Sequence, residues 1–360
     1  MILKEQHVPG TTGMDADVLE ISDPMRLASG PVVSVVMTAF NHAPYVAQSI
    51  GGVLKQETSF EVELIVAEDC SSDSTRDIAV DLQRRHPERI RVVTGAANIG
   101  GPANFRRAMK RARGRYIAFC EGDDYWIDPT KLERQVSMLD ANPALSAVHT
   151  EFAHLISVAG KCRILDRFQG HFRPQIPSGE IFDQLVLGNF IQTCTLCIRT
   201  ELVREYLQHP LSLRGNPVGD WPLCLFASAR AGIAYVETPT AVYRRVPGSA
   251  TNKGGSADIA RARQCMAMID DFCRYYGRPE SLARASHARA HEHILYQSLL
   301  NGLAHDFRTS LQWLTAHDPS QYTNSRWTLI ARLMDRGISR RALASLLKSS
   351  NLLREIRYYK

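Results

Sequence analysis

The 360-residue sequence predicts an α/β fold built on a mostly parallel, doubly wound sheet. The main observation is that short apolar, β-branched runs alternate with stretches of helical spacing between about residues 32 and 148. Hydrophobic residues make up 44% of the chain and charged residues 22%, which is ordinary for a globular protein with a sizeable core. At this length the chain can hold one large domain and a smaller one.

The predicted strands and helices follow one another in a regular order. Because each is a short, largely apolar run, strands are expected at Val32–Thr38, Val62–Ala67, Ile90–Val93, Tyr116–Cys120 and Leu145–Val148. Because apolar residues recur at helical spacing, helices are expected at Tyr45–Lys55, Thr75–His86, Pro102–Arg113 and Leu132–Leu139. Ser74 or Asp73 is the expected N-cap of the second helix.

Two flanking regions differ from this pattern. Residues 1–30 are polar and unpatterned, which is typical of a flexible N-terminal arm. From about residue 257 the pattern is helical alone, with apolar stripes such as Met266, Ile269 and Phe272. We therefore expect an α/β domain over residues 31–255 and an α-helical C-terminal region over residues 256–360.

Polar or aromatic residues follow four consecutive predicted strands. These clusters are Thr38–Asn41, Glu68–Asp73, Asn98–Gly101 and Glu121–Asp124. Because doubly wound sheets bind ligands at the carboxyl ends of their strands, we expect one shared nucleotide pocket. The Phe40 ring could cover a base, and the Asp69 carboxylate could accept a hydrogen bond from it. The sequence has no G-x-G-x-x-G after the first strand and no G-x-x-x-x-G-K-[ST], so neither a dinucleotide-binding fold nor a P-loop is predicted.

The last cluster places three carboxylates, Glu121, Asp123 and Asp124, within four residues. Like charges this close repel one another unless a cation or fixed donors offset the repulsion. Carboxylate oxygens suit Mg²⁺ or Mn²⁺, which commonly bridge a diphosphate. The alternative is an acidic turn that is merely solvated.

Six segments between about Val33 and Ser249 fit one family pattern in the same order. They are Ser34–Asn41, Glu68–Thr75, Asn98–Gly100 with Asn104, Glu121–Trp126, Gly219–Leu223, and Tyr243–Arg244 with Gly248–Ser249. Together they resemble glycosyltransferase family 2, the inverting sugar transferases of the GT-A fold. The resemblance implies a GT-A (nucleotide-diphospho-sugar transferase-like) domain, which the C-terminal helical appendage would follow.

The resemblance implies transfer of a sugar from a nucleotide-sugar donor, UDP- or dTDP-linked, to a hydroxyl of a glycan or lipid-linked acceptor, as in cell-surface polysaccharide biosynthesis. It implies Asp220 as the catalytic general base, and a divalent metal cofactor, Mn²⁺ or Mg²⁺, at Asp124, Asp123 and Glu121. Inversion by in-line attack needs such a base on one side and a stabilised leaving group on the other. The residues implied to bind the nucleotide sugar are Thr38, Phe40, Asn41, Asp69, Asn98, Gly100, Asn104, Asp123 and Arg244. Gln192 and Thr193 are implied to line the acceptor side.

The sequence departs from the family pattern at three positions. Phe40 replaces the usual Tyr, and Cys70 replaces the usual Gly or Asn. Val246 stands where the family has a His. Where that imidazole would help to hold metal or diphosphate, the chain must do without it or use Arg245.

Other interpretations of the same residues stay open. The chain could be a non-catalytic GT-A-like module that binds a nucleotide or a partner. Asp220 could be only the N-cap of a helix with Pro222 in its first turn. Cys194 and Cys197 are expected to be core thiols of a buried strand. A solvated helical face, in place of a metal cluster, is the expectation for His287, His291 and His293.

The net charge of +6 is concentrated near the C-terminus. Residues 326–360 contain nine Lys/Arg and two Asp/Glu, so this stretch carries 9 − 2 = +7 and the rest of the chain 6 − 7 = −1. The stretch could contact an anionic membrane surface or form a docked amphipathic helix pair, and a nucleic-acid partner is not expected. Eight scattered cysteines, no signal-peptide pattern and no apolar run of ~18 residues favour a cytoplasmic location, either free or peripheral at the inner face of the membrane.

Overall fold

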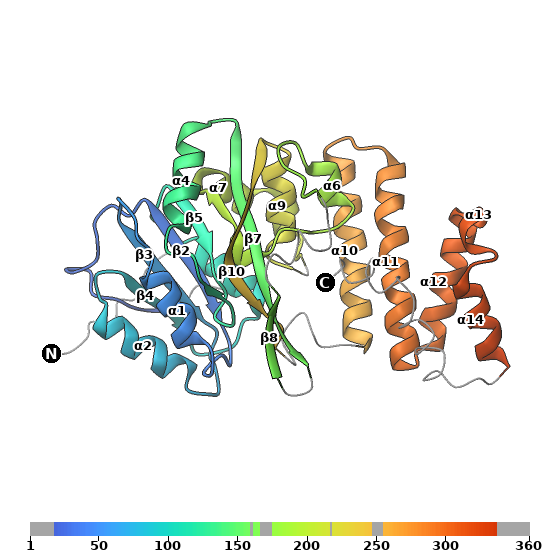
Figure 1. The fold of residues 1–360 in the computed structure, drawn as a ribbon, viewed down its shortest axis with the longest axis horizontal. Coiled ribbons are helices and arrows are strands. Elements are labelled where there is room, and N and C mark those ends of the chain that lie inside the picture. The colour runs from blue at the N-terminus through green and yellow to red at the C-terminus, as the bar shows by residue number, and fades with distance from the viewer. Residues whose placement is uncertain (1–17, 159–160, 166–174, 217, 247–254, 337–360) are drawn as a thin grey trace. The chain divides into compact units, whose positions relative to one another are not determined.

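The computed structural model describes residues 18–158, 161–165, 175–216, 218–246 and 255–336, except for the side chains of residues 156–158, 161–163 and 165. Its contacts divide the chain into two compact units (Figure 1). The sheet unit comprises residues 1–181 and 191–245, and the helical unit comprises residues 182–190 and 246–360. The chain therefore passes from one unit to the other three times.

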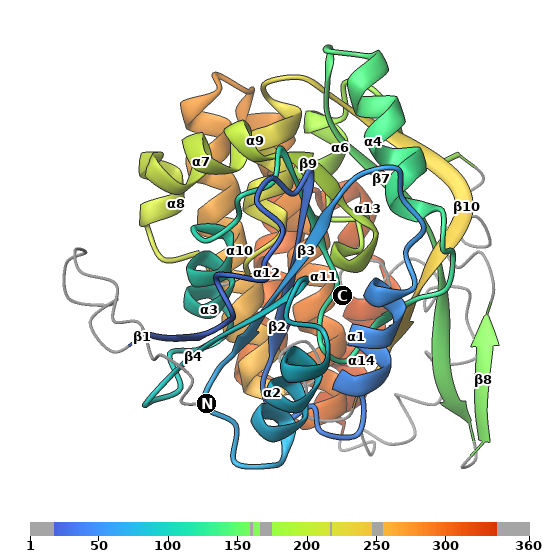
Figure 2. The same ribbon diagram turned by 90° about the vertical axis from the view of Figure 1, so that its left-hand side faces the viewer.

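The parallel half of the sheet contains the strands that the sequence predicts first. β2 (Val33–Ala39), β3 (Val62–Glu68), β4 (Ile90–Gly95) and β5 (Tyr116–Phe119) run parallel in the order β4-β3-β2-β5. Figure 2 labels β2, β3 and β4 of this half. The helices α1 (Val46–Leu54), α2 (Thr75–Arg85) and α3 (Gly101–Met109) connect them, and α4 (Lys131–Ala141) comes after β5. Every residue of β3 is buried, as expected for a central strand that is covered on both faces.

The other half of the sheet is mixed, which the sequence does not predict. The ten-stranded sheet follows the path β1-β4-β3-β2-β5-β9-β7-β10-β6, with β8 paired to β7. The additional strands are β1 (Val18–Ile21), β6 (Tyr125–Trp126), β7 (Leu145–Val158), β8 (Lys161–Leu165), β9 (Cys197–Arg199) and β10 (Gly232–Arg244). β9 is antiparallel to both β5 and β7, whereas β10 is parallel to β7. The helices of this half are η1 (Thr193–Thr195), α7 (Thr200–Gln208), α8 (Pro210–Leu213) and α9 (Trp221–Ser228).

β1 lies inside the N-terminal segment for which the sequence predicts no regular structure. It pairs antiparallel with β4 at the edge of the sheet. Glu20 of β1 forms an ion pair at 2.8 Å with Arg91, which also pairs with the buried Glu63 at 3.0 Å. The ion-pair partner of the strand therefore lies 71 residues later in the sequence. For this reason the residues around β1 contain no local pattern that predicts a strand.

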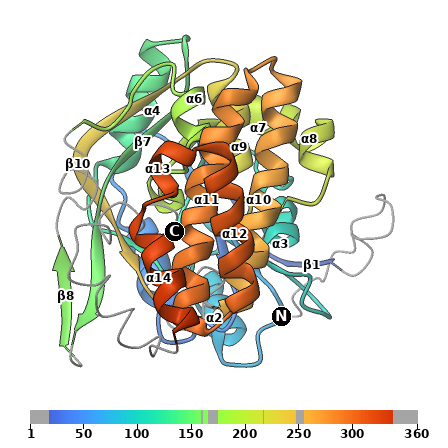
Figure 3. The ribbon, with the colours of Figure 1, turned by 90° about the vertical axis from the view of Figure 1, so that its right-hand side faces the viewer.

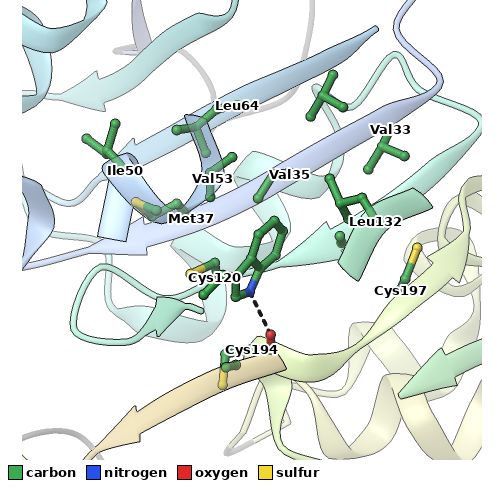
Figure 4. Close-up of a cluster of buried hydrophobic side chains, with 14 of the residues drawn as sticks. Val33, Val35, Met37, Ile50, Val53, Leu64, Cys120, Leu132, Cys194 and Cys197 are labelled. Carbon is green, nitrogen blue, oxygen red and sulfur yellow. Dashed lines mark hydrogen bonds between the residues drawn. The ribbon is translucent and has the colours of Figure 1, made fainter. Parts of the chain in front are cut away.

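The main core of the sheet unit lies against β2, β3 and β5 and beneath α1 and α4 (Figure 4). Its fully buried side chains include Val35, Met37, Ile50, Leu64 and Leu132. The indole N–H of Trp126 donates to the carbonyl of Cys194 at 2.8 Å, as the dashed line in Figure 4 marks. Cys194 and Cys197 are buried in the same cluster, and burial raises the pKa of the Cys197 thiol to about 12. They are core thiols, as expected.

The helical unit contains α6 (Phe182–Val186), α10 (Gly255–Tyr275), α11 (Glu280–Asn301), α12 (Ala304–His317), α13 (Pro319–Tyr322) and α14 (Arg326–Asp335). α11 packs against both α10 and α12 (Figure 3). The short helix α6 joins them through ring contact of Phe182 with Tyr276 at 5.3 Å and a 2.7 Å hydrogen bond from the Ser286 hydroxyl to the Val186 carbonyl. A segment from the middle of the sequence thus belongs with the C-terminal helices.

The histidines of α11 pack between helices, so the expectation of a solvated face is wrong. The His291 ring stacks on Trp313 at 4.4 Å, His287 pairs with Asp270 at 3.0 Å, and His293 is buried. Small polar rings can fill such positions because each also offers an apolar body. Within the described ranges, no three His, Cys, Asp or Glu side chains form a group that could hold a metal ion.

The basic C-terminal stretch begins in α14. Trp327 and Ile330 are buried there in a second apolar core with Leu299 and Phe307, so this part docks within the helical unit. Residues 337–360 lie outside the described residues, and the expected membrane contact falls largely on them. In the part of the chain that is described, none of the helices has the length and hydropathy of a membrane span.

Candidate active site

The acidic turn follows β5 directly, as the sequence predicts. The N–H of Gly122 donates to the carbonyl of Thr38 at 2.9 Å, and the N–H of Asp124 donates to the carbonyl of Glu121 at 3.0 Å. A Cβ at position 122 would lie only 2.8 Å from Nδ1 of His42. Glycine is therefore the residue that lets the turn pack this closely on the loop after β2.

The three carboxylates of the turn are exposed to different degrees. Asp124 is only 1% exposed, and Oε2 of Glu121 is buried without a hydrogen-bond partner among the described residues. Burial, followed by repulsion from Asp123, raises the pKa of Glu121 to about 8. Burial, followed by repulsion from Asp123 and Glu121, raises the pKa of Asp124 well above its usual range. At neutral pH Glu121 therefore keeps a proton that an ordinary carboxyl group loses, and a bound cation would favour its release.

These residues fit a divalent cation that is shared with a phosphate ligand. Such cations take one or two protein carboxylates at a phosphate site, and phosphate oxygens and water complete the ligand set. The turn offers the unpartnered Oε2 of Glu121 and the carboxylates of Asp123 and Asp124. It does not form a closed cage of three protein ligands within the described residues.

Arg244, at the end of β10, holds the turn from the other side. Its N–H donates to Oδ1 of Asp124 at 2.8 Å, and Nη1 donates to the carbonyl of Asp123 at 2.8 Å. Nη2 is hydrogen-bonded to Oε1 of Gln48, and the guanidinium lies 4.4 Å from the ring centroid of Tyr125. The Arg244 side chain is therefore fixed at the acidic turn, next to the carboxylates.

His42 adds an imidazole to the same site, and the sequence does not single it out. Its Nε2 lies 3.8 Å from Oδ2 of Asp123, and its backbone N–H donates to the Thr75 hydroxyl at 2.8 Å. Burial lowers the pKa of His42 in spite of the nearby Asp123 and Asp73, so the ring is neutral at pH 7. One His after a strand has no distinctive spacing, and adjacency to Asn41 is the single signal that could have pointed to it.

The residues after β2 and β3 are tied to each other. Phe40 is 45% exposed, so its ring is accessible for stacking. Asn41 has a left-handed backbone (φ 55°), and its Oδ1 accepts the N–H of Ser72 at 2.9 Å. Cys70, which replaces the family's usual Gly or Asn, also has a left-handed backbone (φ 56°). The turn thus keeps the conformation that favours Gly or Asn although a Cys occupies the position.

Asp69 organises the loop after β4. Its carboxylate accepts the N–H groups of Ile99 at 3.0 Å and Gly100 at 2.9 Å, and the Asn98 amide donates to the Asp69 carbonyl at 2.9 Å. Gly100 has a left-handed backbone (φ 84°), and the Asn104 amide donates to a carbonyl of β3 at 2.7 Å. A carboxylate has about four acceptor positions, so Asp69 can still accept from a base.

Asp220 lies next to the acidic turn although it is far from it in the sequence. It precedes α9 at the N-cap position, but its side chain makes no capping hydrogen bond. Instead, Oδ2 accepts the Thr193 hydroxyl at 2.8 Å. Thr193 and Asp220 both influence the pKa of Glu121: the Thr193 side chain lowers it, and the charge of Asp220 raises it, so both lie near the acidic turn. The geometry therefore does not support the alternative in which Asp220 is only the N-cap of α9.

The site residues expected from the sequence fall into connected groups. Contacts join Glu121, Asp123, Asp124, Asp220 and Arg244, with Thr38 supporting the turn from β2. A second group contains Asp69, Asn98, Gly100 and Asn104, and a third contains Phe40 and Asn41 beside the turn of residues 70–73. All three groups follow carboxyl ends of the parallel strands, where doubly wound sheets bind ligands.

Comparison with protein families and curated proteins points the same way. Residues 34–200 match the family described as glycosyl transferase family 2. An uncharacterized protein of Mycobacterium tuberculosis is 34% identical over 214 residues, which are 59% of this chain and 58% of that protein. The UDP-Glc:α-D-GlcNAc-diphosphoundecaprenol β-1,3-glucosyltransferase WfgD of Escherichia coli is 39% identical over 111 residues, 31% of this chain and 42% of WfgD. The chain thus spans about half the length of the curated relatives that it matches.

Two solved structures share the fold. Staphylococcus aureus TarS (residues 1–349, in complex with UDP-GlcNAc) has a TM-score of 0.54 and 18% identity, covering 79% of this chain and 81% of TarS. The mannosyltransferase PcManGT of Pyrobaculum calidifontis, in complex with GDP-Man and Mn²⁺, has a TM-score of 0.53 and 16% identity, covering 88% of this chain and 84% of PcManGT. These likenesses confirm the predicted α/β fold of GT-A type with helices after it.

Proposed function

Because residues 34–200 form a domain of glycosyl transferase family 2, we propose that this protein is a metal-dependent, inverting glycosyltransferase. It moves a sugar from a UDP- or dTDP-linked donor to a hydroxyl of a glycan or lipid-linked acceptor, as in cell-surface polysaccharide biosynthesis. The observation that carries the proposal is the 2.8 Å hydrogen bond from the Thr193 hydroxyl to Asp220, because Thr193 and Asp220 both also influence the pKa of Glu121 and so lie beside the acidic turn.

Asp220 acts as the general base in this proposal. Its carboxylate accepts the proton of the acceptor hydroxyl while the acceptor oxygen attacks the anomeric carbon from the face opposite the leaving group. This role needs a carboxylate that is separate from the diphosphate site but close to it. Asp220 meets both conditions, because α9 supplies it while the strand end of β5 supplies the acidic turn.

Asp124 and Asp123, with Glu121 beside them, would hold Mn²⁺ or Mg²⁺ together with the donor diphosphate. When bound there, the cation neutralises the charge that develops on the departing nucleoside diphosphate. The solved structure of PcManGT contains Mn²⁺ together with its nucleotide sugar, which supports this assignment. Arg244 adds a permanent positive charge beside the same carboxylates.

Phe40 and Asp69 would hold the base of the donor. The exposed Phe40 ring can stack on uracil or thymine, and Asp69 can accept from the imide N–H. Thr38, Asn41, Asn98, Gly100 and Asn104 would bind the nucleotide sugar together with them. The N–H of Gly100 donates to the Asp69 carboxylate and the Asn98 amide donates to the Asp69 carbonyl. A UDP-linked donor has the most support, because WfgD uses UDP-Glc and the TarS structure contains UDP-GlcNAc.

The acceptor is proposed to be lipid-linked, by analogy with the diphosphoundecaprenol-linked acceptor in the name of WfgD. An acceptor of this kind sits in a membrane surface, and the basic residues of 326–360 would favour contact with anionic lipid at the cytoplasmic face. Vesicle co-sedimentation with and without anionic lipid tests this part of the proposal.

Thermal unfolding with UDP, dTDP and GDP, each with and without Mn²⁺, tests the donor site. A ligand that binds only the folded protein raises the midpoint by mass action, so we expect a rise with UDP that requires Mn²⁺. Release of UDP from UDP-glucose or UDP-N-acetylglucosamine then tests turnover. Nucleotide binding without release of UDP in the presence of acceptor would point to the non-catalytic module instead.

A further inference from the structure

Thr193 lies between the two halves of the proposed site. Its hydroxyl donates to Oδ2 of Asp220 at 2.8 Å, and its side chain also lies close enough to Glu121 to lower the pKa of that carboxyl group. The residue is only 8% exposed, so this hydroxyl does not face bulk water. The hydrogen bond from a buried hydroxyl to a carboxylate is a specific polar contact, and loss of the hydroxyl would remove one donor from Asp220.

The turn that carries Thr193 is held at several points. The Trp126 indole donates to the carbonyl of Cys194 at 2.8 Å, and the Gln135 amide donates to the carbonyl of Thr195 at 2.8 Å. Both donors are buried side chains from other elements of the sheet unit. The Thr193 hydroxyl therefore stands on a rigid support, which is what accurate positioning of a neighbouring group requires.

Asp220 is placed by its helix but is not oriented by it. Its side chain makes no hydrogen bond to the N-terminus of α9. The terminal torsion of an Asp side chain is broad, so the position of its Cα alone does not aim the carboxylate. The hydrogen bond from Thr193 does so, because it ties Oδ2 and thereby sets the direction of the remaining acceptor positions.

We propose that Thr193 is the positioning residue of the general base. Its hydroxyl holds the Asp220 carboxylate in the orientation in which it accepts the proton of the acceptor. In the transfer, the acceptor O–H bond breaks and its proton goes to Asp220, while the acceptor oxygen bonds to the anomeric carbon. The bond between the anomeric carbon and the diphosphate oxygen of the donor breaks, and its electron pair leaves with the nucleoside diphosphate. Thr193 exchanges no proton with the substrate. This inference rests on the proposed function, since Asp220 is a base only if a sugar is transferred.

The test compares Thr193→Val, which removes the hydroxyl with little change in shape, with Thr193→Ser, which keeps it. Thr150→Val is the matched control, because Thr150 is 1% exposed and its hydroxyl pairs with that of Thr240 at 2.7 Å outside the candidate site. For each protein we would measure UDP release from UDP-glucose and UDP-N-acetylglucosamine with Mn²⁺, the Kd for UDP, and the unfolding temperature. If Thr193→Val does not fold, Thr193→Ala replaces it.

Thr193→Val is expected to lower kcat about 10- to 100-fold while the donor KM and the Kd for UDP stay within about twofold. Thr193→Ser should recover most of the rate, and Thr150→Val should lower only the unfolding temperature. Unchanged kcat in Thr193→Val overturns the inference and leaves the proposed function standing. A fall in kcat that Thr150→Val shares, or that Thr193→Ser does not recover, shows a structural role and also overturns it. A wild-type protein that releases no UDP from either donor refutes the proposed function, and this inference with it.

Discussion

The backbone N–H of Arg244 donates to Oδ1 of Asp124 at 2.8 Å, although the two residues are 120 positions apart in the sequence. This bond joins the end of β10 to the acidic turn after β5. Once a bound cation favours ionisation of Asp124, this becomes a hydrogen bond to a charged acceptor, which is among the stronger kinds in proteins. Because the donor is a main-chain group, the orientation of Asp124 does not depend on which side chain stands at position 244.

Asp124→Asn is expected to abolish the Mn²⁺-dependent stabilisation by UDP while the protein stays folded. The Asn amide oxygen can still accept from the N–H of Arg244, but the charge that would attract the cation is gone. The measurement is the unfolding midpoint with UDP, with and without Mn²⁺. Asp81→Asn, at an exposed carboxylate of α2, is the control. A full Mn²⁺ response in Asp124→Asn would remove this residue from the metal site.

Glu121→Gln is expected to weaken the pH dependence of stability of the ligand-free protein. The pKa of Glu121 is about 8 in the folded state against an ordinary 4.5, so the folded protein binds more protons than the unfolded chain between these values. Stability therefore falls as the pH rises from 4.5 to 8, and by pH 7 the loss is about 3 kcal/mol.

Urea unfolding at pH 5, 6, 7 and 8 measures this slope in wild type and variant. Asp124 contributes in the same direction, because its pKa is also raised, so the slope in Glu121→Gln is reduced but not zero. Equal slopes in the two proteins would show that Glu121 does not retain its proton. Mn²⁺ with UDP should flatten the wild-type curve, because a bound cation favours the ionised carboxylates.

Asp220→Asn is expected to lower kcat about 10²- to 10⁴-fold, the usual contribution of a general base. The Kd for UDP in the presence of Mn²⁺ should not change, because Asp220 belongs to the acceptor side. The amide can still accept the Thr193 hydroxyl, so folding should be retained. Steady-state UDP release and isothermal titration separate the two effects. A wild-type rate in this variant would move the base to another residue.

Phe40→Ala is expected to weaken UDP binding by about 1–3 kcal/mol, the usual worth of stacking between a base and an aromatic side chain. Because Phe40 is 45% exposed, its truncation should change the free energy of unfolding little. Phe40→Tyr keeps the ring and is expected to bind UDP as wild type does. If Phe40→Ala binds UDP with unchanged affinity, the ring does not cover the base.

The parallel half of the fold could be predicted from the sequence because its elements carry local signals. Each strand from β2 to β5 is a compact apolar run, and each helix between them repeats apolar residues at helical spacing. Of the mixed half, the start of β7 could be predicted as a strand at Leu145–Val148. β9 and β6 could not be predicted, because they have three and two residues and their pairing partners lie far along the chain. Such strands are defined by what they pair with rather than by their own composition.

The candidate site divides in a similar way. The acidic residues after β5 could be found because three carboxylates after a buried strand are unusual, and Asp220 came with a second acidic motif. His42 was missed, and Thr193 was placed only on the acceptor side, because neither has a spacing that marks its role. Their functions depend on Asp123 and Asp220, which are distant in the sequence, so only the fold shows the contact.

The three crossings of the chain between its units make the protein difficult to divide into independent modules. A truncation after Arg245 would leave α6 without the Arg278 guanidinium, which pairs with Asp183 at 3.2 Å, and without the Ser286 hydroxyl. An exchange of C-terminal regions between relatives would therefore have to transplant residues 182–190 together with everything after residue 245. Among relatives, a substitution in residues 182–190 is accordingly expected to occur together with a compensating substitution in α10 or α11.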